Sequence, residues 1–461
     1  MRNPYSPLET AVWLRALFGH IRLGRLSREQ LLAQQRERFA RLAAHAARHS
    51  PYYRELVRRE RIDPLHCRPE HFPVLTKRTL IDRFDDLVTD RKITRRRIED
   101  FLSRSSDPRE LFDDQYHVVH TSGTSGAVAL FVFSHDDWIV GASQIARALP
   151  LRLRQRTAFL GATRGHFTAV SLMLAGNHGA NRVFHNVRTY DVSQPLSDII
   201  EGLNRFQPHR LAGYGSVIHM LAEAQQRGTL HIRPRHIGNG GEMLHSQSKQ
   251  YIESAFDAKM QNVYASSEHL YMGMNLGGDD ALYLLEDDLI YELHDDHACV
   301  TNLFNRTLPL IRYRMDDVLV PDEAPSLATG RRRQSPYRRV RNIVGRRENA
   351  LILTNRRGED DFIHGNIIVE FYVPGLAAWQ AVSLDTTSFL FRVRYQTGLT
   401  AERKQRAERA IHERWRALLA EKHLDNVQFR VEEVPNLGPD PRTGKFRLVV
   451  PADDTEQRKV A

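Results

Sequence analysis

The sequence predicts an α/β protein in which a large N-terminal domain of mixed β-sheets flanked by helices is followed by a small α+β domain. Residues 113–260 alternate short apolar runs with amphipathic stretches, which is typical of βαβ units. Near the C-terminus, residues 388–431 carry a strand, helix and strand pattern. At 461 residues the chain is long enough for two or three domains.

The N-terminal region, residues 8–62, is predicted to be helical. Ser50-Pro51 ends a run in which five residues recur at near-helical spacing: Leu31, Gln35, Phe39, Leu42 and Ala46. Further along, residues 128–133 are predicted as a strand and residues 217–224 as a helix ended by Arg227-Gly228.

The C-terminal pattern is more regular. Residues 388–396 alternate apolar and polar side chains, residues 401–423 have one apolar helical face, and Val427, Phe429 and Val431 alternate again. This unit predicts a small domain of about 110 residues. The Arg-rich stretch 323–342 lies upstream and is predicted to be a surface loop.

Composition limits the class of protein. A formal net charge of +10 suits anionic partners such as nucleotides, coenzyme A, nucleic acid or an acidic membrane surface. The two cysteines, Cys67 and Cys299, are far apart, which argues against a disulfide framework and a Cys-type zinc site. No run approaches about 18 apolar residues, and there is no signal-peptide pattern, so we expect a cytoplasmic protein without a membrane span.

The segment Thr121-Ser122-Gly123-Thr124-Ser125-Gly126 precedes an apolar run. Its glycines allow the backbone to approach a ligand, and its hydroxyl and N–H groups can surround a phosphate chain. It is not a Walker A loop, because no Gly-Lys-Ser/Thr follows. Alone, it is also compatible with a polar turn.

Four further segments carry polar groups suited to a nucleotide. Gly240-Gly241-Glu242 and Tyr264-Ala265-Ser266-Ser267-Glu268 place carboxylates beside hydroxyls, as Mg²⁺ on a nucleotide requires. Asp317 ends a run that contains Arg312 and Arg314, and an Asp can accept both hydroxyls of a ribose. Lys445 lies on a Gly-flanked loop and can neutralise charge at a reacting phosphate or carboxylate.

In this order, the segments resemble the adenylate-forming superfamily of acyl-CoA synthetases, luciferases and peptide-synthetase adenylation domains. The branch that the chain resembles most is that of phenylacetate–CoA ligases and their capsule-biosynthesis relatives. Three segments support this branch: residues 50–54, residues 72–77 and residues 206–216. The resemblance covers about residues 30–450 and implies a large adenylation domain over 1–346 and a mobile lid domain over 347–461 that carries the catalytic lysine.

The resemblance implies a role for each position. Thr121 to Gly126 would hold the β- and γ-phosphates of ATP, Gly241 and Glu242 would lie against the adenine, and Tyr264 would stack on it. Ser267 would contact the α-phosphate, Glu268 would bind Mg²⁺, and Asp317 would bind the ribose. Arg346 would contact the ribose or phosphate, Lys445 would act in adenylation, and the lid would pivot near Arg347-Glu348. The acid pocket would include His166, Phe167, Tyr214, Gly215 and Gly238.

The chain departs from the family pattern at several positions. Ala127-Val128-Ala129 follows the phosphate loop, where a Pro and often a Lys are usual. Ala265 stands at a usual Gly-type position, Ser267 replaces a Thr, and Met315-Asp316-Asp317 replaces a Thr-Gly-Asp-like run. The groups needed for adenylation are present despite these changes.

The implied activity is ATP-dependent conversion of a carboxylic acid, aryl or another small organic acid, to its acyl-AMP, followed by transfer to the thiol of coenzyme A. Other acceptors remain open: an amine, a hydroxyl, a carrier-protein thiol, or AMP transfer to a cofactor. A basic nucleic-acid-binding protein is a different reading, but it needs a concentrated basic stripe that the sequence lacks. Relatives are often dimers, so a homodimer is also compatible.

Overall fold

The computed structural model describes residues 13–14, 18–19, 26–120, 128–147, 154–175, 185–241, 246–276, 281–315, 317–322, 335–344, 350–363, 367–368, 373, 375–395, 398–435, 437 and 448–450. Their α-helices are α2 (Arg28–His49), α3 (Pro51–Arg59), α4 (Lys77–Asp82), α5 (Phe84–Leu87), α6 (Arg95–Leu102), α7 (His135–Ser143), α8 (Thr168–Ala175), α9 (Leu196–Phe206), α10 (Gly215–Gln226), α11 (Ser246–Phe256) and α13 (Ala401–Glu421). Two short 3₁₀ turns are η1 (Pro69–His71) and η2 (Gln144–Arg147).

The strands of the large domain are β1 (Tyr116–His120), β2 (Leu130–Ser134), β3 (Gln155–Gly161), β4 (His185–Asp191), β5 (Arg210–Gly213), β6 (His236–Gly240), β7 (Met260–Ser266), β8 (Leu270–Asn275), β9 (Leu282–Leu284), β10 (Leu289–Leu293), β11 (Ala298–Asn302), β12 (Tyr313–Met315), β13 (Val318–Pro321) and β14 (Arg339–Val344). Those further along are β15 (Leu351–Thr354), β16 (Asp360–Ile363), β17 (Leu376–Ser383), β18 (Ser388–Tyr395), β19 (Gln428–Glu433) and β20 (Val449–Val450).

The N-terminal helices begin and end where their capping residues predict. Ser27 and Gln30 form a capping box at the start of α2, and the N–H groups at the helix start are thereby satisfied. Ser50 caps α3, whose first residue is Pro51, a residue well suited to that position. The predicted helical run therefore divides into two helices at Ser50-Pro51, and residues 8–12, 15–17 and 20–25 lie outside the described residues.

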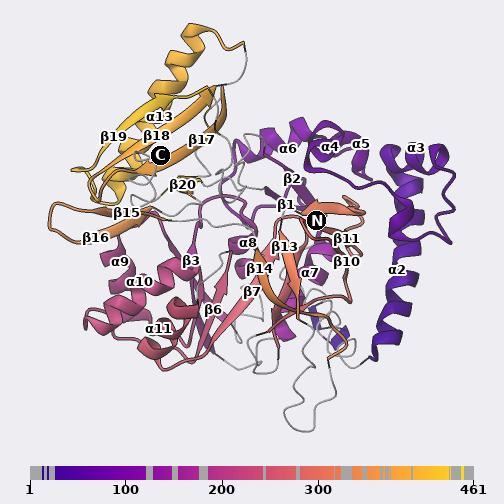
Figure 1. The fold of residues 1–461 in the computed structure, drawn as a ribbon, viewed down its shortest axis with the longest axis horizontal. Coiled ribbons are helices and arrows are strands. Elements are labelled where there is room, and N and C mark those ends of the chain that lie inside the picture. The colour runs from indigo at the N-terminus through magenta and orange to yellow at the C-terminus, as the bar shows by residue number, and fades with distance from the viewer. Residues whose placement is uncertain are drawn as a thin grey trace.

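The centre of the large domain is a nine-stranded sheet with the order β13-β14-β9-β8-β7-β6-β5-β3-β4. The strands from β7 to β4 are parallel, and those from β8 to β13 are antiparallel. Helices α9, α10 and α11 lie together beside the parallel half (Figure 1). Their apolar faces form one core with β5 and β6, and a second core joins α2 to α7 with β1, β2 and the strands from β8 to β12. The mixed sheet flanked by helices confirms the predicted α/β class.

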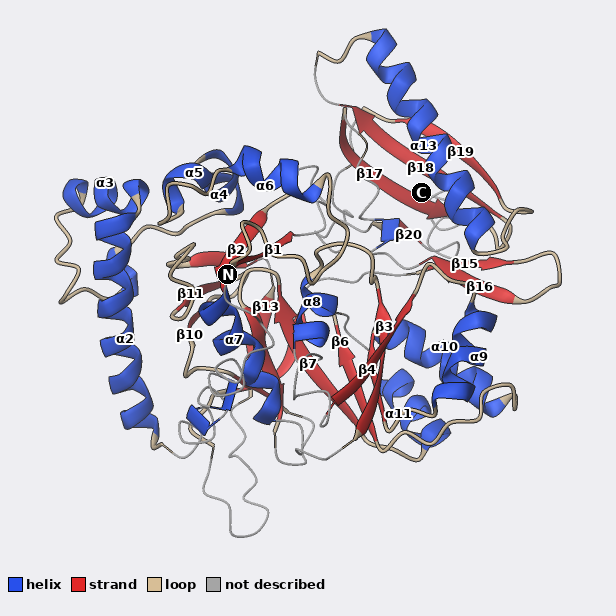
Figure 2. Cartoon of the chain, turned by 180° about the vertical axis from the view of Figure 1, so that it is seen from behind, coloured by secondary structure: helices blue, strands red, loops and turns tan. Residues whose placement is uncertain are grey.

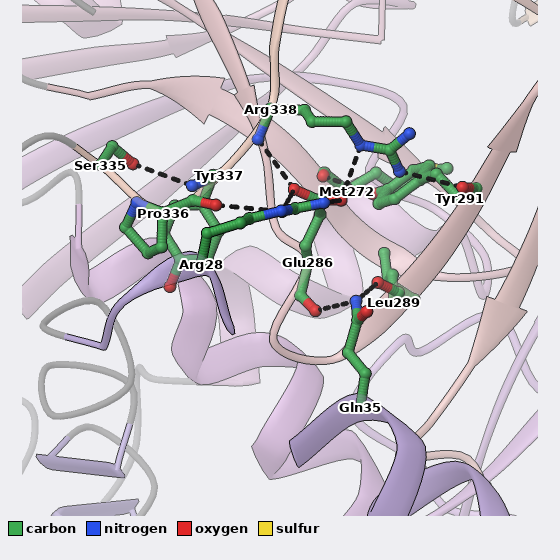
Figure 3. Close-up of polar contacts among 10 residues, drawn as sticks. All are labelled: Arg28, Gln35, Met272, Glu286, Leu289, Tyr291, Ser335, Pro336, Tyr337 and Arg338. Carbon is green, nitrogen blue, oxygen red and sulfur yellow. Dashed lines mark hydrogen bonds and ion pairs between the residues drawn. The ribbon is translucent and has the colours of Figure 1, made fainter. Parts of the chain in front are cut away.

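Helix α2 is fixed to this sheet through Glu286, whose carboxylate is almost fully buried. The carboxylate accepts hydrogen bonds from the Arg28 side chain and from both the backbone and side chain of Arg338 (Figure 3). Gln35 of α2 donates to the backbone oxygens of Glu286 and Leu289. Charge-assisted bonds of this kind are stronger than neutral ones, so they fix the position of the helix.

The C-terminal strands form a separate four-stranded sheet with the order β19-β18-β17-β20, covered by α13 (Figure 2). Trp415 of α13 packs on Phe389 and Phe391 of β18, which explains the apolar periodicity seen in the sequence. The strand–helix–strand prediction is confirmed. The predicted loop over 323–342 is wrong at its end, because residues 339–342 belong to β14, which pairs with β9 and β13.

Candidate active site

Four neighbouring parallel strands end at one edge of the large sheet. Leu160 of β3 pairs with Gly213 of β5, Gly213 pairs with Asn239 of β6, and Gly240 pairs with Val263 of β7. The chain passes from β3 outward to β4 and then returns to β5 on the other side of β3. Ligands of α/β sheets bind in the crevice at such a reversal, outside the carboxyl ends of the strands.

Several predicted site residues follow these strand ends directly. Tyr214 follows β5, Gly241 follows β6, and Ser267 and Glu268 follow β7. Since these strands are adjacent and parallel, their last residues share one edge. The structure thus brings together residues that are separated by more than fifty positions in the sequence.

Tyr264 and Asp317 are in direct contact. The Tyr264 hydroxyl donates a hydrogen bond of 2.9 Å to Asp317 Oδ2, and Asp317 is 5% exposed. The ladder between β7 and β8 shifts register between Tyr264 and Ala265, and such bulges redirect side chains beside active sites. The contact places the residue expected at the adenine beside the residue expected at the ribose.

Tyr214, which follows β5, lies close to Gly241 at the end of β6 and to Ala162 at the end of β3. Gly241 has a φ of +83°, and a Cβ there would lie 3.3 Å from Tyr214 Cε1. The Tyr214 hydroxyl accepts a long 3.5 Å hydrogen bond from the N–H of Ala162, which follows β3. Gly213, with a φ of +149°, leaves no room for a side chain because a Cβ would clash with the Leu160 carbonyl.

Ser267 joins β7 to two other segments. Its hydroxyl donates to the carbonyl oxygen of His120 at 3.3 Å and accepts from Thr168 Oγ1 at 2.8 Å. The ring of Phe167 meets the ring of His120 edge to face at 4.9 Å. His120 is the last described residue before the predicted phosphate loop, which begins at Thr121 in the sequence.

Glu268 lies in the turn between β7 and β8 and is 2% exposed. Within the described residues, its Oε2 is buried without a hydrogen-bond partner. Leu270, two residues on, is fully buried with a φ of +60°, a strained conformation for a bulky residue. A buried carboxylate oxygen without a partner is costly, and a divalent cation is the partner that oxygen ligands favour. These residues therefore fit Mg²⁺.

His166 lies between β3 and α8 and is held by a hydrogen-bond network with Ser105 and Glu110. Its Nε2 lies 3.0 Å from Ser105 Oγ, and Ser105 donates its hydroxyl proton to Glu110 at 2.5 Å. Because the Ser105 hydroxyl proton is already donated to Glu110, the Nε2–H of His166 donates to Ser105 Oγ. Burial lowers the pKa of His166, so the ring is neutral near pH 7. A role for His166 in the acid pocket stays a prediction.

Other predicted residues divide into two groups. Gly215 begins α10 and Gly238 lies in β6, and both are buried. The remaining predicted positions lie outside the described residues: Thr121, Ser122, Gly123, Thr124, Ser125, Gly126, Glu242, Arg346, Arg347, Glu348, Lys445. The proposed domain boundary at 346–347 falls in the same gap.

Sequence reasoning missed Asp191, which ends β4 and supports the loop after β3. Its carboxylate accepts from the N–H and hydroxyl of Thr163 at 3.0 and 2.6 Å, and from Ser193. Burial alone would raise the pKa of Asp191, but these hydrogen bonds outweigh it and lower the pKa. An Asp followed two residues later by Ser is a local signal for such a turn. Thr168, the partner of Ser267, carried no comparable signal.

The large mixed sheet and the separate four-stranded C-terminal sheet define the fold of this chain. Solved structures of 2-hydroxyisobutyryl-CoA ligase share it. In complex with 2-HIB-AMP and CoA in the thioesterification state, that ligase is 19% identical, with a TM-score of 0.59 over 95% of this chain and 94% of its own. The same ligase in the postadenylation state with R3-HIB-AMP is 18% identical to this chain, with a TM-score of 0.58, and the match covers 95% of this chain and 94% of the ligase.

A curated relative adds a partial match in sequence. Protein CapK of Staphylococcus aureus is 30% identical over 165 residues, which are 34% of this chain and 35% of CapK. The chain thus matches about a third of the length of this relative. No family model matches the chain. Among the described residues, no helix is long and apolar enough to cross a membrane.

Proposed function

We propose that the protein uses ATP to activate a small carboxylic acid as its acyl-AMP, releases pyrophosphate, and transfers the acyl group to a thiol, that of coenzyme A. The grouping at the end of β7 carries this proposal. Tyr264 contacts Asp317, Ser267 donates to the carbonyl oxygen of His120, and Glu268 is buried with an oxygen that has no partner in the described residues. A nucleotide with its cation needs this combination of an aromatic face, a carboxylate for ribose and a carboxylate for metal.

In this proposal, Glu268 holds Mg²⁺, which would offset the negative charge of the phosphates when it is bound. Ser267 contacts the α-phosphate, and Asp317 holds the ribose hydroxyls with its orientation set by Tyr264. Lys445 stabilises the charge that develops as the carboxylate oxygen bonds to the α-phosphorus and pyrophosphate leaves. Arg346 and the segment from Thr121 to Gly126 hold the remaining phosphate oxygens.

Acid-dependent exchange of labelled pyrophosphate into ATP tests the first step. We expect Lys445→Ala and Glu268→Gln each to slow the exchange by roughly 10²- to 10³-fold, as loss of a preorganised charge does. Lys259→Ala is a matched control, since that side chain is 93% exposed and pairs only with Glu253 in the described residues. Exchange by both variants at the wild-type rate would refute the mechanism.

The acceptor is tested separately by the mass of the product. The protein is incubated with ATP and acid, with and without coenzyme A. A thioester that forms only with coenzyme A supports the proposal, and 2-hydroxyisobutyryl-CoA ligase, which has the same fold, was solved with CoA and an acyl-AMP. An acyl-AMP that accumulates unchanged in the presence of coenzyme A would exclude this acceptor and favour an amine, a hydroxyl or a carrier protein.

A further inference from the structure

Arg210, at the start of β5, is a buried cation without a described partner. It is 7% exposed, and within the described residues its guanidinium makes no hydrogen bond or ion pair. Burial lowers its pKa to about 10, which still leaves it charged near pH 7. An uncompensated charge in a protein interior is strongly unfavourable, so a group of this kind indicates an anionic ligand.

The register of the sheet places this guanidinium on one particular face. Leu211 and Ile237 point into the core beneath α9, α10 and α11. Because side chains alternate along a strand, Arg210 lies on the opposite face, together with Ala212 and Gly238. A Cβ at Gly238 would lie 3.5 Å from Arg210 Nη2, so the guanidinium reaches the β6 backbone.

Two polar groups occur on elements of that same side. Ser171 of α8 is 5% exposed, and within the described residues its hydroxyl has no partner. Tyr271 of β8 is 7% exposed; burial raises its pKa to about 12, although the nearby Arg210 acts in the opposite direction. Leu172 of α8 and Tyr271 belong to the same apolar core, separate from the core of α9 to α11. Of these two groups, Tyr271 interacts electrostatically with Arg210, so its hydroxyl is the candidate donor to an anion bound there.

The distance from the strand ends suggests which part of a ligand reaches Arg210. Gly238 precedes the last residue of β6, Gly240, by two positions, which is roughly 7 Å along a strand. The reacting carboxylate belongs beyond that end, beside Ser267 and Glu268. At about 1.2 Å of advance per bond along an extended chain, a diacid of four or five carbons measures roughly 6–7 Å from the oxygen at one end to the oxygen at the other, which matches the interval.

We propose that Arg210 binds a second anionic group, a carboxylate or a phosphate, at the far end of the acid, so that the substrates are short dicarboxylic or phosphate-bearing acids. This inference rests on the proposed function and replaces the expectation of an aryl acid. Arg210 is a specificity-determining residue: its fork of N–H groups matches both oxygens of a carboxylate or phosphate. A purely apolar far end would leave the buried charge unpaired.

Matched acids test the proposal in pyrophosphate exchange. Succinate and glutarate are compared with butyrate and pentanoate, which differ only in the far carboxylate, and 3-phosphoglycerate represents the phosphate class. In the wild type, we expect kcat/KM for an anionic acid to exceed that of its matched partner by on the order of 10²-fold or more. In Arg210→Met this ratio falls to near one, whereas Arg156→Met, a surface change on the adjacent strand, preserves it. A wild-type preference for butyrate and pentanoate would overturn the proposal while leaving adenylation intact.

A second measurement does not depend on turnover. Without substrate, Arg210→Met should unfold at a higher urea concentration than the wild type, because the variant removes an unpaired buried charge. Succinate or inorganic phosphate should raise the unfolding midpoint of the wild type but not of Arg210→Met. Lower stability of the variant, combined with no protection of the wild type by any of the anions, would show that Arg210 is structural and would overturn the proposal even if no acid supported exchange.

A separate observation concerns the β10–β11 hairpin. Leu293 pairs with Ala298, and the N–H of His294 donates to the His297 carbonyl at 2.9 Å. His294 and His297 are therefore opposite each other, and Cys299 follows on the same face as His297. Potential ligand atoms of these three residues all lie within 4.8 Å of one another.

The hairpin also contains a carboxylate that orients one of these histidines. Asp296 Oδ1 lies 2.6 Å from His297 Nδ1, which leaves Nε2 of His297 for a metal. We infer that His294, His297 and Cys299 bind a divalent transition metal such as Zn²⁺, with water completing the tetrahedron. Cysteine binds a metal as the thiolate, so binding at this site releases the Cys299 thiol proton.

Cobalt provides a direct probe of this site. The metal-free full chain is titrated with Co²⁺, and we expect one equivalent to give a thiolate-to-cobalt charge-transfer band. Cys299→Ser should abolish this band, and His297→Ala should weaken the affinity at least 10-fold, as expected for loss of a ligand. Cys67→Ser, which alters the other thiol, should leave it unchanged. Absence of the band in the wild type, or its persistence in Cys299→Ser, would overturn the assignment.

Discussion

Replacing Lys422 with methionine tests how the C-terminal domain is attached to the large domain. Lys422 follows α13, and its side chain is fully buried. Its ammonium group pairs with Asp361 at 3.0 Å and donates to the carbonyl oxygens of Val192 and Gln194 at 3.1 and 2.9 Å. Val192 and Gln194 precede α9 in the large domain, so one side chain joins segments from both parts of the chain.

The expected cost follows from what the substitution leaves behind. Methionine keeps the length of the side chain but makes none of the three contacts, and Asp361, 7% exposed at its side chain, loses its cation. Breaking a buried ion pair by removing one partner costs about 3–5 kcal/mol. Asp361→Asn should cost less, about 1–3 kcal/mol, because Lys422 retains both carbonyl acceptors. The double variant should cost less than the sum of the two, since the partners interact.

Hydrogen exchange and urea unfolding measure this effect. The N–H of Leu196, which donates to Asp361 at 3.2 Å, should exchange faster in Lys422→Met. Tryptophan fluorescence follows unfolding in both parts of the chain, from Trp138 in the large domain and from Trp379 and Trp415 in the C-terminal core. Lys404→Met provides the control, since Lys404 is a partly exposed lysine of α13 that pairs with Glu433. If Lys422→Met matched the wild type in both measurements, the ion pair would not hold the two parts together.

Three further predictions concern the site and its support. Tyr264→Phe removes the 2.9 Å hydrogen bond to Asp317, which costs about 1 kcal/mol of binding free energy. We therefore expect the KM for ATP, measured in steady-state kinetics, to rise roughly 5- to 10-fold. An unchanged KM would contradict the role of Tyr264 in positioning Asp317. Folding lowers the pKa of His166 below 6.5, so the unfolded chain binds more protons below that pH, and the free energy of unfolding falls with decreasing pH by up to about 1.4 kcal/mol per pH unit. The urea midpoints at pH 7.5 and pH 5.5 should therefore differ less in His166→Gln than in the wild type. An equal difference in the two proteins would refute the assignment. Glu286→Ala should lower the free energy of unfolding by about 1–3 kcal/mol. The loss is limited because both arginine side chains that bind Glu286 are 38% exposed and can be solvated by water in the variant. A loss above about 5 kcal/mol in urea unfolding would contradict this.

Local patterns in the sequence predicted much of the secondary structure. The helix expected over 217–224 is α10, Gly215–Gln226, and the alternating residues near 388–396 form β18. The strand in residues 339–342 was missed because its structure depends on pairing with β9 and β13, which are distant partners in the sequence. Tyr264 and Asp317 were recognised through motifs, whereas their hydrogen bond follows from tertiary structure.

Residues outside linear motifs were harder to find for the same reason. Arg210 and the group formed by His294, His297 and Cys299 have no diagnostic spacing in the sequence. Their significance depends on sheet register and on burial, which places an arginine beside Gly238 and two histidines opposite each other in a hairpin. The wide separation of the two cysteines argues against a zinc site that uses both of them. It does not bear on a site formed by a single cysteine and two histidines.

Lys422 and Arg210 show how buried cations can be distinguished. Each is removed from water, and burial lowers the pKa of both. Lys422 has a carboxylate and two carbonyl oxygens, so its position is explained by the protein itself. Arg210 has no such acceptor in the described residues, and it lies on the sheet face below the edge where Ser267 and Glu268 gather. The same desolvation thus has a structural explanation at Lys422 and requires a ligand at Arg210.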